Sequence, residues 1–130
     1  MASLDTPLDR LRTICLALPE AHEVLAWGEP TFRVRNKMFA MYAHADNHHG
    51  AGHHAVWCNS TSFLQDMLVR SRPDRFFVPA YVGPKGWIGI RLDRRPSWRE
   101  VADLVRDAYR LTAPKRLAHA LPDRPSARRR

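Results

Sequence analysis

Proline and glycine interrupt this chain so often that no helix or strand in it can be long. The 130 residues include ten prolines and six glycines. A proline inside a helix removes a backbone hydrogen bond and clashes with the turn before it, so most prolines mark a boundary. The clearest stops are Pro19, Pro73, Pro114 and the turn at residues 83–86. This spacing favours a fold built from short helices and hairpin strands.

Three segments carry helix signals between these stops. Thr6 followed by Pro7 and Asp9 is typical of a helix start, and Pro19 ends that helix. Asn59-Ser60 is expected to cap a second helix, which Pro73 ends. The apolar positions of this second helix are Phe63, Leu64, Met67 and Leu68.

The third helix has the strongest local signal in the sequence. Ser97 and Glu100 form a capping box, in which each residue can satisfy a backbone N–H near the helix start. Pro114 breaks or kinks this helix, and residues 115–120 are expected to add one last turn. Helical spacing predicts that the inward residues are Trp98, Val101, Leu104, Val105, Ala108 and Leu111.

The strand signals lie between the helices. Short extended runs are expected at 23–27, 31–35, 37–44, 54–58, 76–82 and 87–92. Gly28-Glu29-Pro30 reads as the first turn and Arg35-Asn36 lies near the second. The Gly83–Gly86 turn predicts that 87–92 pairs back on 76–82 as a hairpin. The order is helix, three or four strands, helix, two strands, helix, which predicts an α+β fold with a largely antiparallel sheet and helices on one side.

The positive charge is concentrated at the C-terminal end. The formal net charge is +8, and the segment from Lys115 onward holds six cations and one anion. The rest of the chain is therefore only at +3, with 15 cations and 12 anions. We expect a single domain over 1–121 and a disordered basic tail over 122–130. A basic chain is compatible with nucleic-acid or acidic-membrane contacts but proves neither.

The two cysteines, Cys15 and Cys58, are too few for a disulfide framework. Both are expected to be small buried hydrophobes. The first residues resemble no signal peptide, and no run reaches membrane-spanning length. The sequence therefore predicts a cytoplasmic protein with no membrane partner. It does not fix the oligomeric state, for which a monomer is favoured.

Several segments, taken in order, resemble the MmcQ/YjbR family over roughly residues 8–118. They are Leu16–Ala21, Ala26–Val34, Lys37–Ala40, Val78–Ile88 and Leu111–Leu117. The resemblance implies an α-β(3)-α-β(2)-α arrangement similar to secretion-chaperone-like folds, in agreement with the element order above. It also implies DNA binding, a label that the family often carries, and it names no catalytic residues. The histidine-rich loop and the arginine-rich tail depart from the family pattern, so neither inherits a role.

A basic aromatic surface is the leading candidate for function. Side chains alternate along strands, so Arg33 and Arg35 share one face while Phe32 and Val34 point to the other. If the helices cover the apolar face, the open face carries cations and an indole that hold phosphates and stack on bases. The candidate DNA-binding residues are Arg33, Arg35, Lys37, Lys85, Trp87 and Arg91.

The alternative is a pocket for a small anion or a peptide, in a module without a nucleic-acid role. A lysine beside tryptophans can hold an anionic ligand through charge and aromatic packing. Its candidate residues are Trp27, Tyr81, Lys85 and Trp87. A third interpretation, a protein-interaction module, rests on the chaperone-like topology alone.

Metal binding and catalysis have less support. The loop at 45–53 is rich in glycine and histidine, but its spacing matches no zinc motif. Its weak candidate ligands are His48, His49, His53 and His54. No nucleophile has a base and an acidic orienter by motif, and no paired carboxylates stand out. We therefore expect a binding domain that is not an enzyme and has no cofactor or dedicated metal.

Overall fold

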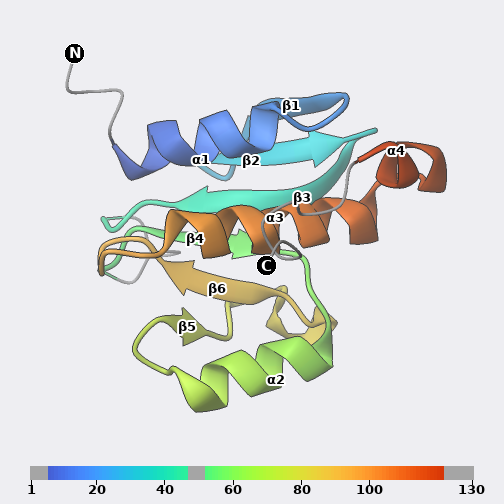
Figure 1. The fold of residues 1–130 in the computed structure, drawn as a ribbon. Coiled ribbons are helices and arrows are strands. Elements are labelled where there is room, and N and C mark those ends of the chain that lie inside the picture. Colours follow the sequence, from blue (N-terminus) through green and yellow to red (C-terminus); the bar gives the residue numbers. More distant parts are fainter. Residues whose placement is uncertain (1–5, 47–51, 122–130) are drawn as a thin grey trace.

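The computed structural model describes residues 6–46 and 52–121, which form one antiparallel sheet with helices packed on it (Figure 1). The strands are β1 (Ala21–Ala26), β2 (Glu29–Val34), β3 (Lys37–Ala43), β4 (Ala55–Cys58), β5 (Phe76–Phe77) and β6 (Ile88–Arg91). The helices are α1 (Pro7–Leu16), α2 (Ser62–Ser71), the 3₁₀ turn η2 (Gly83–Lys85), α3 (Trp98–Thr112) and α4 (Lys115–Ala120). The strand order is β1-β2-β3-β4-β6-β5, with every neighbouring pair antiparallel. The predicted fold class is confirmed.

The helix starts follow the predicted chemistry, with two corrections. The Thr6 hydroxyl accepts from the N–H of Asp9, and the Ser97 hydroxyl accepts from the N–H of Glu100. The cap of α2 is Thr61, not Asn59 or Ser60, because Thr61 is the extended residue whose hydroxyl accepts from the N–H of Leu64. Only the Ser97 half of the predicted capping box forms, because the Glu100 carboxylate pairs with Arg72 and ties the start of α3 to the end of α2.

The β1–β2 and β2–β3 connections are two-residue hairpins, which moves the first turn from its predicted place. Ala26 pairs with Glu29, so the turn is Trp27-Gly28, and Pro30 already lies in β2. Val34 pairs with Lys37, so the second turn is Arg35-Asn36, as its predicted position indicated. All four turn residues have positive φ, the geometry that type I′ hairpins need to match strand twist.

The segment after β5 is the main departure in the strands. Residues 76–82 were expected to be extended, but only Phe76–Phe77 pair, with Ile90 and Gly89 of β6. Pro79 cannot donate to a ladder, and Tyr81 has a positive φ of 65°, so the chain leaves the sheet there. Four strands precede α2, within the predicted three or four. The fourth, β4, lies between β3 and β6 in the sheet.

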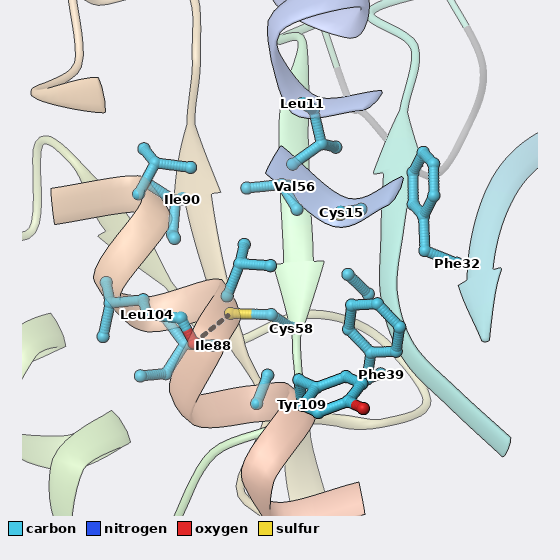
Figure 2. Close-up of a cluster of buried hydrophobic side chains, with 14 of the residues drawn as sticks. Leu11, Cys15, Phe32, Phe39, Val56, Cys58, Ile88, Ile90, Leu104 and Tyr109 are labelled. Carbon is cyan, nitrogen blue, oxygen red and sulfur yellow. Dashed lines mark hydrogen bonds between the residues drawn. The ribbon is translucent and has the colours of Figure 1, made fainter. Parts of the chain in front are cut away.

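The main core lies between the helix side of the sheet and α1 and α3 (Figure 2). Leu11 and Cys15 of α1, Phe32 of β2 and Val105 of α3 are all fully buried. Cys58 is also buried and its Sγ lies 4.0 Å from the carbonyl oxygen of Leu104, so both cysteines are free core residues, as predicted. Burial raises the pKa of Cys15 well above its ordinary value and that of Cys58 to about 12.

Three of the predicted apolar helix positions face solvent instead. Leu111 is 53% exposed, and Tyr109 takes the inward place, where its hydroxyl donates to the carbonyl of Pro19. Phe63 is 77% and Met67 46% exposed, because α2 packs at the β5 edge and buries mainly Leu68. No helix among the described residues is long and apolar enough to cross a membrane. The predicted tail at 122–130 lies outside the described residues.

Candidate functional site

The sheet face opposite the helices is partly sealed by a second apolar cluster. Its buried members are Met41, Ala43, Ala55, Trp57 and Trp87, with Met38, Phe77 and Val82 packed against them. Alternation along β6 is confirmed, since Ile88 and Ile90 point into the main core. Trp87 is only 6% exposed, however, so its indole does not lie on an open face. Val82, from the segment that leaves the sheet, packs against the same cluster and helps to bury it.

The turn before Trp87 is fixed on α2. The side-chain amide of Gln65 donates to the carbonyls of Gly83 (2.8 Å) and Trp87 (2.7 Å). Gly86 has φ +94°, and a Cβ there would lie 2.9 Å from the backbone nitrogen of Ser62. Lys85 is therefore an exposed cation on a firmly held turn.

Trp27 and Arg33 form the most distinctive contact on the uncovered part of this face. The Arg33 guanidinium carbon lies 6.0 Å from the centroid of the Trp27 ring, a cation–π contact. Arg33 Nε also donates to the Thr31 hydroxyl (3.1 Å), which donates to the carbonyl of Val24 (2.6 Å). Thr31 is fully buried, whereas the Trp27 ring that leans toward Arg33 remains 63% exposed.

Two backbone features place this pair. Trp27 has φ 55° at a turn position where asparagine or glycine is usual, and a bulky residue there is an outlier. Strained positions of this kind cluster at functional sites. The β2–β3 register shifts between Phe32 and Arg33, and such bulges re-aim side chains. Neither feature was predicted, although the Trp-Gly pair between two strands is a visible hairpin signal.

Two further side chains of β1 share the face of Arg33. His22 lies opposite Arg33 and Val24 opposite Thr31 in the β1–β2 ladder, so they share its face. The acid on the same face is Glu29, which is fully buried. Its Oε1 lies 2.6 Å from Nδ1 of His44, and both of its oxygens accept from the N–H of His44. We call His22, Val24, Trp27 and Arg33 the β1–β2 surface.

Two of the other predicted cations, Arg35 and Arg91, are already bound by protein groups. Arg35 makes a two-bond ion pair with Glu20 (2.7 and 3.2 Å), which lowers the pKa of Glu20. Arg91 lies on β6, beyond β3 and β4, where its Nη1 donates to the carbonyl of Asp74 (3.0 Å) and its guanidinium lies over Phe77. Lys37 is exposed at the start of β3. Arg91 is thus separated from Arg33 by two strands, whereas Arg35 and Lys37 lie at the β2–β3 turn near Arg33.

The alternative pocket is not assembled. Trp27 follows β1 at one edge of the sheet, and Trp87 precedes β6, four places along the strand order. Four strand spacings amount to about 19 Å. The two tryptophans also lie at opposite ends of the strands. Trp27 is next to the end where Ala43 pairs with Ala55, whereas Trp87 is next to the end where Ile88 pairs with Cys58. Tyr81 is 73% exposed.

The histidine candidates also point to different partners. Nδ1 of His53 lies 2.9 Å from Asp93, whereas Nδ1 of His54 lies 2.9 Å from the Tyr42 hydroxyl. Over residues 6–46 and 52–121, no three metal-binding side chains come together. His48 and His49 lie outside the described residues.

Comparison with known proteins decides the family. The family model described as YjbR matches residues 16–111. The chain belongs to the YjbR family. Among solved structures, a crystal structure of the Deinococcus radiodurans protein DR2400, with a domain described as DUF419, is similar with a TM-score of 0.67 and 20% identity. That match covers 80% of this chain and 76% of the other and shows the shared fold. No curated protein matches the sequence. The YjbR match begins at Leu16 and ends at Leu111, so it spans the β1–β2 surface and the whole sheet.

Proposed function

We propose that this YjbR-family domain is a non-enzymatic binding module that holds DNA on its β1–β2 surface. The observation that carries the proposal is the exposed indole of Trp27, held in a strained turn with the Arg33 guanidinium against its ring. An exposed aromatic ring can stack on any of the four bases, and a neighbouring guanidinium can bind the phosphate.

The geometry favours single-stranded DNA over duplex. A lone indole at a hairpin tip can receive an unstacked base, whereas none of the named duplex-reading modules is present in the sequence. Lys37 and Lys85 are exposed and add to the attraction from a distance, as do the cations of the C-terminal residues. Two free buried thiols suit a reducing compartment, so we infer a cytoplasmic location.

The test compares two arginines that are close in sequence but differently engaged. Binding of a labelled single strand of about 16 nucleotides is measured by anisotropy from about 50 mM salt upward. Arg33→Ala should weaken binding about tenfold and reduce the salt slope by about one, because it removes a phosphate contact. Arg35→Ala is the matched control, since Glu20 already occupies its guanidinium, and it should change affinity less than about twofold.

Two outcomes would contradict the proposal. One is the absence of binding by the wild-type chain at low salt. The other is equal loss in both variants, which would indicate general attraction to net charge. A chain ending at residue 121 should bind DNA more weakly overall. The Arg33→Ala and Arg35→Ala variants of that chain should still differ in DNA affinity by the same factor.

A second candidate function is self-association through β1. This strand lies at the edge of the sheet, and an uncovered edge can pair with another strand. It carries the exposed apolar residues Val24 (37%) and Leu25 (75%), and the exposed Trp27 (63%) comes directly after it. Leu25 lies opposite Pro30, so it faces away from the β1–β2 surface. A dimer in sedimentation equilibrium that Leu25→Arg dissociates would favour this candidate, whereas a monomer at all concentrations would remove it.

A further inference from the structure

A cavity of about 420 Å³ lies where α3 ends and α4 begins. Pro114 forces this geometry, because Ala113 is extended (ψ 155°) and the chain turns before α4 starts. Figure 1 shows α4 turned sharply away from the axis of α3. The lining residues are Arg110, Ala113, Lys115, Ala118, His119 and Leu121.

The lining divides into a cationic half and an apolar half. Arg110, Lys115 and His119 can each carry positive charge, and the other three residues are aliphatic. Within the described residues, Lys115 and His119 have no hydrogen bond or ion pair, although both side chains border the cavity. Arg110 pairs with Asp107 at 3.4 Å, a long contact for a charge-assisted bond. Among the described residues, no carboxylate lines the cavity.

Cations that border one cavity repel one another, and an anion bound between them relieves that repulsion. The last carbonyls of α3 add partial negative charge nearby, so the affinity for an anion must come from the side chains. An arginine fork, an ammonium point charge and an imidazole N–H together match the several oxygens of a phosphate better than the two of a carboxylate. The volume lies within the range of small-molecule sites.

We propose that this cavity binds a small phosphate-bearing ligand, with the phosphate between Arg110, Lys115 and His119 and a compact apolar part against Ala113, Ala118 and Leu121. The site lies at the end of the segment Leu111–Leu117, which the DNA proposal leaves without a role. It does not depend on that proposal, since the β1–β2 surface belongs to other elements.

The test is a titration of the full 130-residue chain with inorganic phosphate, followed by backbone amide chemical shifts at constant ionic strength. Saturable shifts are expected around residues 110–119. Lys115→Gln should weaken phosphate binding at least tenfold. Arg94→Gln, which removes another exposed cation far along the chain, is the matched control and should leave binding unchanged. Asp107→Asn should tighten binding by about two- to fivefold, because a competing carboxylate is removed.

A second arm separates phosphate from other anions. Acetate should bind at least tenfold more weakly, and equal affinity would overturn the assignment to a phosphate. Shifts that do not saturate, that spread over every basic surface, or that Lys115→Gln leaves unchanged would mean an adventitious ion only. Because Lys115 is exposed, its replacement should leave the thermal midpoint intact, so a lost signal reports on the site.

Discussion

The buried carboxylate of Glu29 lies 2.6 Å from Nδ1 of the His44 ring. It joins the first residue of β2 to the residue that follows β3, and its oxygens also accept from the N–H of His44. These bonds close the end of the sheet from which Trp27 projects. The contact is therefore structural support for the β1–β2 surface.

Glu29→Ala should lower the free energy of unfolding by about 1–3 kcal/mol, because it removes the acceptor of the His44 N–H. Glu29→Gln keeps one acceptor oxygen of nearly the same shape and should lose less. Urea denaturation of both variants measures the difference. Equal losses would show that the bonds to His44 are not the reason for the burial of this carboxylate.

The turn at 83–86 offers a test of packing with a built-in control. Gly86 and Gly52 have nearly the same φ, +94° and +91°, but a Cβ at Gly86 would meet the backbone of residues 60–62 and one at Gly52 would meet nothing within 4 Å. Gly52→Ala should therefore cost only about 1 kcal/mol for its conformation. Gly86→Ala should cost about 1–2 kcal/mol more, since backbone must move. Similar thermal midpoints for the two variants would contradict the close packing of this turn on α2.

The buried thiol of Cys58 gives the stability a defined pH dependence. Burial raises its pKa from 9.0 to about 12, so the folded protein keeps the proton that the unfolded chain releases. The unfolded state then binds fewer protons above pH 9, and stability falls as pH rises. The contribution of the protonated Cys58 thiol to the free energy of unfolding is complete below pH 9 and is lost as the pH rises from 9 to about 12.

The stability difference between wild type and Cys58→Ala should therefore shrink by about 1.4 kcal/mol per pH unit above this onset. Lysines and tyrosines titrate in both proteins and cancel in the comparison. Urea unfolding at a series of alkaline pH values measures it. A difference that stays constant would mean that the thiol ionises in the folded state as readily as in the unfolded one.

Local signals in the sequence were enough for most of the fold. Pro19, Pro73 and Pro114 mark the helix ends because a missing N–H acts wherever the proline stands. The alternation that sends Phe32 and Ile88 into the main core is also local, since it follows from strand geometry. The spacing of apolar residues and the positions of proline and glycine could not show how far each strand continues, as the short β5 illustrates.

The site was predicted less well, because exposure and pairing depend on distant segments. Trp87 has the right alternation for an open face, but Val82 and the turn on α2 help to bury it. Arg35 is bound by Glu20, fifteen residues earlier in the chain. Arg33 lies where it was expected, but its contact with Trp27 depends on the turn and the bulge together. The contacts of Arg35 with Glu20 and of Gln65 with Trp87 join distant segments, and they leave no mark in the spacing of residues.

The replacement Trp27→Asn separates stability from binding in a single variant. Asparagine tolerates positive φ better than tryptophan and suits a type I′ turn with Gly28, so the strain at this position is relieved. The indole is mostly exposed, so little burial is lost with it. Phe63→Ala, which removes an exposed aromatic ring from α2, is the control for general stickiness and should bind DNA like wild type.

The decisive measurement is the single-stranded DNA affinity of Trp27→Asn at low salt, taken beside its free energy of unfolding. The account predicts a stability equal to or above that of wild type together with an affinity about tenfold lower, the loss of one stacked base. An affinity unchanged from wild type, in a variant that is folded, would contradict DNA binding at this surface.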